Sequence, residues 1–239
     1  MYNGIKLFAD GADYDDIIRL NEDDRIDGFT TNPTLLRKAG VNDYENFAKS
    51  VLKKIKDKPI SFEVFDDSLD GMINQALYIS KWGDNVYVKI PITNTKGIGT
   101  RDIIKYLSEQ GVKINVTAIM TAKQGEEILS SMSKSTRGII SIFAGRIADT
   151  LIDPLQTIQR LSSYYHAQKC ENVNLLWAST REILNIKQAR DAGADIITVS
   201  PNILKKMDLI GKNLDLYSLE TVQMFYNDAK EAGYTLNNG

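Results

Sequence analysis

The stretch Val86-Tyr87-Val88-Lys89-Ile90-Pro91 has the β-branched and aromatic residues of a short buried strand, and a proline closes it. Similar runs recur along the chain at residues 5–9, 28–31, 60–65, 85–90, 113–119, 138–143, 173–178 and 196–199. Most are almost continuously apolar, as strands covered on both faces should be, and the segments between them are long enough for helical crossovers. We therefore expect these runs to pair in parallel, with a helix after each.

Several of the intervening segments begin with residues that start helices. Two pairs look like capping boxes, and two others place a cap before a proline at the first helical position. In chain order they are Asn42 with Glu45, Thr121 with Gln124, Asp153 with Pro154, and Ser200 with Pro201. A final helix is expected over residues 218–232, where apolar residues recur at helical spacing before Gly233.

Eight β/α units in 239 residues, with no linker between them, favour a closed (β/α)8 TIM barrel. We expect one domain over residues 1–239, with the final helix as an addition to the barrel. An open, doubly wound sheet is the alternative. In a barrel, functional groups gather at the carboxyl ends of the strands, so polar residues at those ends are the candidates for a site.

Composition narrows the chemistry that such a site could use. The chain carries 29 Lys+Arg against 31 Asp+Glu, a net charge of −2. It therefore lacks the excess of positive charge that proteins use to bind nucleic acid or an anionic membrane. No signal-peptide pattern or membrane-length apolar run is found, so we expect a cytoplasmic protein. One Cys and one His exclude an intramolecular disulfide and argue against a zinc site. Without metal or cofactor, catalysis would rest on lysine, carboxylates, amides, hydroxyls or arginine.

Polar residues do stand at the predicted strand ends. They are Asp10, Thr31, Asn32, Glu63, Lys89, Asn115, Thr117, Ser141, Ser179 and Arg181. A charge late in a buried strand is costly unless it is paired or faces a cavity, so Asp10, Glu63 and Lys89 form a candidate site. Lys89 alone could be a lysine that extends its amine to solvent. The two carboxylates favour instead a desolvated amine that attacks a carbonyl to form a Schiff base, because that chemistry needs proton transfers.

Five ordered segments resemble the signature blocks of the transaldolase family, most closely its short branch of transaldolases and fructose 6-phosphate aldolases. They are Thr30-Thr31-Asn32-Pro33-Thr34-Leu35-Leu36, Val88-Lys89-Ile90-Pro91, Asn115-Val116-Thr117-Ala118, Ser141-Ile142-Phe143-Ala144-Gly145-Arg146-Ile147-Ala148-Asp149 and Trp177-Ala178-Ser179-Thr180-Arg181. The resemblance implies a (β/α)8 barrel with the Schiff-base lysine on the fourth strand, and Lys89 lies on the fourth predicted run. It also implies a homo-oligomer, no cofactor, and a place in pentose phosphate metabolism.

The resemblance assigns roles to the residues at the strand ends. Lys89 would form the imine, Asp10 would take the proton of the substrate C4 hydroxyl, and Glu63 would act through a water held with Thr117. Side chains from the matching blocks would bind the substrate. The three-carbon unit would be held by Asn32, Asn115 and Ser141, and the distant anionic group by Arg146, Ser179 and Arg181. Thr31 and Phe143, from the same blocks, are expected to bind the substrate as well.

Two residues favour a transferase over an aldolase within this family. The third-strand position tends to be Glu in transaldolases and Gln in fructose 6-phosphate aldolases, and the sixth-strand aromatic tends to be Phe rather than Tyr. This chain has Glu63 and Phe143. The resemblance therefore implies transfer of a dihydroxyacetone unit from a ketose phosphate to an aldose phosphate, with release of free dihydroxyacetone as the alternative.

Two departures from the family pattern leave other substrates open. Gly11 follows Asp10 where many relatives have Thr or Ser, and Thr180 replaces an aromatic that is frequent in larger transaldolases. Both could reshape the pocket around the anion, so a ketose with a C6 sulfonate is a further candidate substrate. A barrel that binds sugar phosphates without catalysis is the alternative from another class, and the retained Asp10, Glu63 and Lys89 argue against it.

Overall fold

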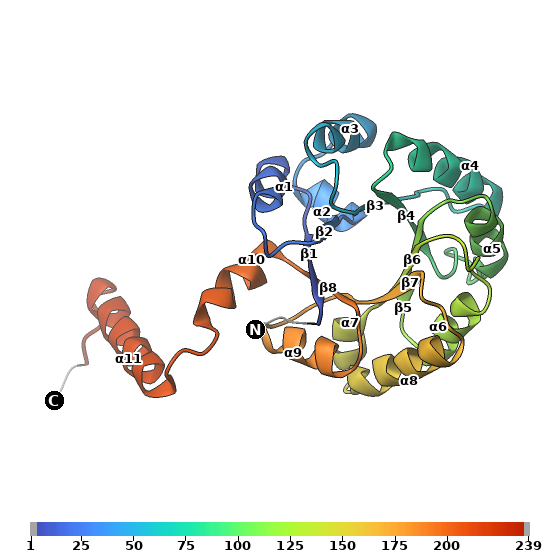
Figure 1. The fold of residues 1–239 in the computed structure, drawn as a ribbon. Coiled ribbons are helices and arrows are strands. Elements are labelled where there is room, and N and C mark those ends of the chain that lie inside the picture. Colours follow the sequence, from blue (N-terminus) through green and yellow to red (C-terminus); the bar gives the residue numbers. More distant parts are fainter. Residues whose placement is uncertain (1–3, 237–239) are drawn as a thin grey trace. The chain divides into compact units, whose positions relative to one another are not determined.

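The computed structural model describes residues 4–236, and within this range eight parallel strands close into a barrel in sequence order. The strands are β1 (Lys6–Asp10), β2 (Gly28–Thr30), β3 (Ile60–Glu63), β4 (Val86–Pro91), β5 (Ile114–Ile119), β6 (Gly138–Ile142), β7 (Val173–Trp177) and β8 (Ile196–Val199). The predicted (β/α)8 barrel is confirmed, and the open sheet is excluded because β1 pairs with β8. Figure 1 shows the strands at the centre and, in the part of the chain that ends at Leu204, helices in a ring around them.

The helices follow the strands as expected. They are α1 (Tyr14–Asn21), α2 (Pro33–Lys38), α3 (Tyr44–Lys54), α4 (Leu69–Ile79), α5 (Arg101–Glu109), α6 (Ala122–Leu129), α7 (Ala144–Ala148), α8 (Pro154–Ala167), α9 (Leu184–Asp191), α10 (Pro201–Leu204) and α11 (Leu214–Glu231), with short 3-10 turns η1 (Ser80–Trp82) and η2 (Lys205–Leu209). None of the helices in residues 4–236 is long and apolar enough to cross a membrane.

The helix caps confirm two of the predicted starts and correct a third. Thr121 and Gln124 form a capping box at α6, and Asp153 caps α8 ahead of its proline. The expected box of Asn42 and Glu45 is wrong, because Asp43 takes the cap position of α3. Its backbone is extended and its Oδ1 accepts the Asn46 N–H at 3.0 Å, so the carboxylate satisfies the free amide one residue later than predicted.

The chain divides into two compact units, one ending at Leu204 and the other beginning at Lys205. The first contains the barrel. The second contains η2 and α11, and α11 starts earlier than the expected residue 218 because Asn213 caps it by accepting the N–H groups of Asp215 and Leu216.

Side chains fill the barrel in layers because alternate residues of each strand face the same side. An apolar layer crosses the middle of the barrel. It comprises Phe8, Tyr87, Ile139, Leu176, Ala178 and Ile196, with Phe143 packed against it. Gly28 makes room for this layer, since a Cβ at Gly28 would lie 2.6 Å from the ring of Phe8. Residues of the layer line a cavity on each side, and the cavity at the carboxyl ends of the strands contains the predicted site.

Candidate active site

Backbone pairing places three of the predicted residues at one level of the barrel. Glu63 of β3 pairs in register with Lys89 of β4, and Lys89 pairs with Asn115 of β5. Register partners in a parallel sheet point to the same face, so these side chains come together inside the barrel. Their relative positions are therefore set by strand hydrogen bonds.

Lys89 is buried against two groups that orient its amine. Its Nζ lies 2.9 Å from Glu63 Oε1 and also donates to the backbone carbonyl of Thr31. Lys89 and Glu63 are 7% and 5% exposed. Moving a lysine and a glutamate out of water costs free energy, and their attraction in the interior adds little net stability. The presence of the Lys89–Glu63 pair at the edge of a cavity therefore indicates a functional role.

Thr31 completes the surroundings of Glu63. The single hydrogen of the Thr31 hydroxyl is shared between two acceptors, Glu63 Oε2 at 3.0 Å and the Ser61 carbonyl at 2.9 Å. Burial raises the pKa of Glu63, while the charge and hydrogen bond of Lys89 and the Thr31 hydroxyl oppose part of that increase. A carboxyl with a raised pKa exchanges a proton with its neighbours more readily near neutral pH than an ordinary glutamate.

Asp10 lies on the other side of the mouth with its own hydrogen-bonded support. The Thr30 hydroxyl lies 2.8 Å from Asp10 Oδ1 and 2.5 Å from the Thr198 hydroxyl. Burial raises the pKa of Asp10, and the charge of Lys89 with hydrogen bonds from Thr30 and Asn32 lowers it in part. Asp10 is thus a partly buried carboxylate that feels the charge of Lys89, an arrangement suited to a general base.

Most of the predicted residues line one cavity of about 440 Å³ at this end of the barrel. Those that line it are Asp10, Asn32, Glu63, Lys89, Thr117, Ser141, Phe143, Arg146 and Ser179. Three others, Thr31, Asn115 and Arg181, are not part of the lining. Thr31 and Asn115 are fully buried beside it, so the structure places them as supports for lining residues and not as direct contacts.

Asn115 is held in a chain of polar side chains across three strands. Its amide donates to the Ser61 hydroxyl at 3.0 Å, and its carbonyl accepts the Ser141 hydroxyl at 2.7 Å. The interaction fixes the orientation of Ser141, which does line the cavity. Within residues 4–236 the buried Thr117 hydroxyl has no hydrogen-bond partner, which leaves it available to a substrate or solvent oxygen at the cavity wall.

The two predicted anion-binding arginines have different environments. Arg146 lines the cavity, and its guanidinium lies 5.7 Å from the centre of the Phe143 ring, within the range of a cation–π contact. Arg181 is half-exposed and pairs with Asp149. The structure thus places Arg146 in the cavity lining and leaves Arg181 outside that lining.

Tyr44 is a residue of the site that the sequence did not reveal. Its hydroxyl accepts the Glu63 N–H at 2.7 Å and donates to the Glu63 carbonyl at 3.2 Å. Its ring packs edge-on against Phe62, Phe65 and Trp82. In the sequence Tyr44 is only an apolar member of an amphipathic helix, and no local pattern signals a hydroxyl that clamps a residue of a distant strand.

We expect Tyr44→Phe to lower both stability and turnover. The Glu63 N–H and C=O would lose their buried partner, at a cost of about 2 kcal/mol in the free energy of unfolding. The carboxylate that contacts Lys89 would lose its fixed position, so kcat should fall on the order of 10-fold with little change in KM. Denaturant unfolding and steady-state kinetics measure the two effects.

Tyr78→Phe is the matched control, because Tyr78 is exposed and its hydroxyl donates to the side chain of Glu45, away from Glu63 and Lys89. Stability and kinetics should remain at the wild-type values. An equal loss of kcat in both variants would contradict a positioning role for Tyr44.

No group of three or more His, Cys, Asp or Glu side chains that could hold a metal ion is found in the part of the chain that the structure describes. The site is instead built around a lysine, two carboxylates and hydroxyl and amide side chains.

Comparisons with known proteins show the family of the chain. The transaldolase/fructose-6-phosphate aldolase family matches residues 7–238. The chain belongs to this family. A protein of Hyphomonas neptunium named "Probable transaldolase" is 35% identical over 231 residues, which cover 96% of this chain and 99% of that protein. One of the same name from Streptococcus pyogenes serotype M5 is 37% identical over 203 residues, covering 85% of this chain and 90% of the relative.

A solved structure, KGPDC from Streptococcus mutans, shares the fold. It superposes with a TM-score of 0.55 at 12% sequence identity, covering 84% of this chain and 90% of the other. This likeness shows the barrel alone, whereas the family match extends to the enzyme class: the chain is a transaldolase-type enzyme.

Proposed function

We propose that this enzyme is a transaldolase that moves a dihydroxyacetone unit from a ketose phosphate to an aldose phosphate through a Schiff base on Lys89. The observation that carries the proposal is the buried contact of 2.9 Å between Lys89 and Glu63 at the wall of a cavity that Asp10 also lines. A lysine, a proton acceptor beside it and a second carboxylate across the cavity are the groups that this reaction requires.

Imine formation begins at the Lys89–Glu63 pair. Glu63 accepts a proton from the Lys89 ammonium, and the neutral amine forms a bond to the ketone carbon. The carbinolamine hydroxyl leaves as water when a proton is returned to it, and the C=N bond forms. The raised pKa of Glu63 suits this exchange, and the Thr117 hydroxyl lies in the cavity wall where the departing oxygen can be held.

Carbon–carbon cleavage uses Asp10 as the base. Asp10 takes the proton of the C4 hydroxyl, the C3–C4 bond breaks, and its electron pair moves into the protonated imine to give an enamine. The aldose leaves, and an incoming aldose phosphate adds to the enamine with Asp10 returning the proton. Hydrolysis of the imine then regenerates Lys89 and frees the new ketose.

Substrate positioning follows the geometry of the cavity. Ser141, oriented by Asn115, and Asn32 are placed to bind hydroxyls of the three-carbon unit. Arg146 supplies a guanidinium for a phosphate or sulfonate at the far end of the sugar, where such contacts hold the reacting atoms in place. Phe143 adds an apolar wall without a hydroxyl to hold water, which favours transfer over release of dihydroxyacetone.

Product analysis tests the function. The enzyme is incubated with fructose 6-phosphate, with and without erythrose 4-phosphate, beside fructose that carries a C6 sulfonate. Formation of sedoheptulose 7-phosphate and glyceraldehyde 3-phosphate only with the acceptor is expected. Free dihydroxyacetone as the main product would indicate an aldolase, and turnover of the sulfonate alone would place the enzyme in sulfosugar breakdown. No reaction with any of them would overturn the proposal.

The pH dependence of turnover should report Asp10. Because Asp10 acts as an ionised base and burial raises its pKa above the ordinary 3.8, activity should fall as the pH drops through that raised value. Between the ordinary and the raised pKa, Asp10 is protonated in the folded state and ionised in the unfolded state. Its contribution to the free energy of unfolding is therefore present at low pH and is lost as the pH rises through the raised pKa. A kcat–pH profile and unfolding at several pH values measure both effects.

Asp10→Asn separates this role from imine formation. The variant should still form an imine, so borohydride should trap the uncleaved six-carbon sugar on Lys89 where the wild type yields a three-carbon adduct. Asp15→Asn, at an exposed carboxylate of α1, is the control and should behave as the wild type. A three-carbon adduct on Asp10→Asn at the wild-type rate would refute the role of Asp10.

A further inference from the structure

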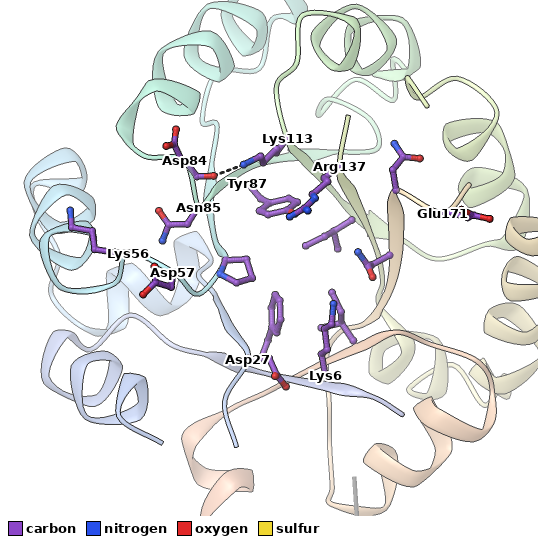
Figure 2. A pocket seen from close by; sticks show the side chains of 16 residues that line it. Lys6, Asp27, Lys56, Asp57, Asp84, Asn85, Tyr87, Lys113, Arg137 and Glu171 are labelled. Atoms are coloured by element: carbon purple, nitrogen blue, oxygen red, sulfur yellow. Dashed lines mark hydrogen bonds between the residues drawn. The ribbon is translucent and has the colours of Figure 1, made fainter. Parts of the chain in front are cut away.

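A second and larger cavity, of about 680 Å³, lies at the amino ends of the strands. Figure 2 shows it from close by, with the charged residues labelled around its centre. The residues that line it and those that line the Lys89 cavity do not overlap. The apolar layer of the barrel contributes to the walls of both cavities, so a molecule bound at the amino end would be separate from the reacting groups.

Three cations occupy inward positions of this cavity. Lys6 lies in β1, and Lys113 and Arg137 directly precede β5 and β6. Each stands two residues before an inward-facing residue, namely Phe8, Asn115 and Ile139, and side chains two apart in an extended chain share a face. In Figure 2 Lys6 and Arg137 extend toward the centre of the cavity. Lys113 donates to the backbone carbonyl of Asp84, which leaves its positive charge uncompensated.

The acidic residues of the cavity lie in its rim. Asp27, Asp57, Asp84 and Glu171 all belong to the loops that lead into strands. The carboxyl groups of Asp84 and Glu171 are directed away from the centre in Figure 2, and Asp27 Oδ2 accepts the Leu7 N–H at 2.8 Å. Across residues 4–236, no ion pair joins these carboxylates to the three inward cations. The three inward cations are therefore not neutralised by ion pairs within the described residues.

The floor beneath the cations is apolar and partly aromatic. Phe8, Tyr87, Ile139 and Ile196 form it, and Pro59 adds to one wall. Burial raises the pKa of Tyr87, so its phenol stays neutral beside Arg137. An apolar floor with a few convergent charges is the composition of a small-molecule site, and the volume lies in the range of such sites.

We propose that this cavity binds a phosphate monoester that carries a ring, such as a nucleotide or a sugar phosphate, at a site distinct from the Lys89 cavity. Arg137 and Lys6 hold the phosphate, because a guanidinium matches phosphate oxygens with two donors and an ammonium adds a second charge. The ring rests on the floor of Tyr87 and Phe8.

Calorimetric titration of the full chain with adenosine monophosphate, ribose 5-phosphate and inorganic phosphate tests this assignment. We expect at least one of the two monoesters to bind with a Kd below about 1 mM. The double variant Arg137→Gln/Lys6→Gln should weaken that binding at least about 10-fold, since both charge-assisted contacts are lost. Lys56→Gln is the matched control, because Lys56 is directed away from the centre in Figure 2, and should leave binding unchanged.

A structural readout locates the bound molecule. With isoleucine methyl groups labelled for NMR, the monoester should shift Ile139 and Ile196 in the floor and leave Ile92, beyond the other end of β4, unchanged. Tighter binding of adenosine monophosphate identifies a nucleotide ligand, and tighter binding of ribose 5-phosphate identifies a sugar phosphate.

Three results would overturn the proposal. They are binding of inorganic phosphate as tight as that of both monoesters, affinity unaffected by Arg137→Gln/Lys6→Gln, and no binding of either monoester at 1 mM or below. Because the two cavities share no lining residue, these results are independent of whether the enzyme transfers dihydroxyacetone. The double variant should retain wild-type turnover in either case.

Discussion

Lys89→Met is expected to lower turnover by about 10⁴-fold or more, because the variant cannot form the covalent imine through which every later step passes. Borohydride reduction in the presence of fructose 6-phosphate should leave the variant unmodified, whereas the wild type should gain a three-carbon fragment on Lys89. Mass spectrometry of the intact chain and of its peptides gives both readouts.

Two controls distinguish chemistry from folding in this experiment. Lys105→Met removes an exposed lysine of α5 and should leave both turnover and trapping unchanged. In Lys89→Met the buried carboxylate of Glu63 no longer has the Lys89 ammonium as its partner, which should lower stability. The double variant Lys89→Met/Glu63→Gln removes that unpaired charge, so it should recover stability but remain inactive. Trapping of the fragment on a residue other than Lys89 in the wild type would refute the mechanism.

Gly145→Ala is expected to have the second-largest effect, on stability and on activity together. A Cβ at Gly145 would lie 1.7 Å from the Ser179 carbonyl oxygen and 2.9 Å from Arg181 Nε, so the backbone after β6 or after β7 would have to move. Such overpacking against backbone should cost about 2–4 kcal/mol of unfolding free energy. The displaced segments carry Arg146 and Ser179, so KM for a phosphorylated substrate should rise as well.

Gly99→Ala provides the comparison for this substitution. A Cβ at Gly99 meets no atom within 4 Å, so the same chemical change should leave the melting temperature and KM near wild-type values. If both glycine variants lost the same stability, close approach at Gly145 would not be the cause.

The parts of the site that lie in strands could be predicted from the sequence. Apolar runs locate the strands, and a charge near the end of such a run is conspicuous, so the sequence alone predicts that Asp10, Glu63 and Lys89 belong to one site, and all three line the same cavity. The end of β3 was less predictable. It stops at Glu63 because the Phe65 and Asp66 amides bond to the Gln75 side chain, a contact that strand composition does not encode.

Contacts between distant segments account for the rest. Tyr44 of α3 bonds to Glu63 of β3, and the spacing of residues along α3 does not predict a contact with a strand. Arg181 was expected beside the anion with Arg146, but the choice of Asp149 as its partner depends on how two loops pack. Thr31 was expected to meet substrate, whereas its hydroxyl is used by Glu63 and by the Ser61 carbonyl. Hydroxyls of this kind have several possible partners, and only the folded chain selects among them.

The register of β3, β4 and β5 has a consequence for engineering. Since backbone pairing fixes Glu63, Lys89 and Asn115 at one level, mutations confined to the loops should leave the reacting groups at their distances. Arg146 and Ser179 follow the ends of their strands, outside that ladder. Directed evolution toward new aldehyde acceptors should therefore randomise Arg146 and Ser179. Variants from such a library should keep the reaction at Lys89 and differ in the aldehyde that they accept.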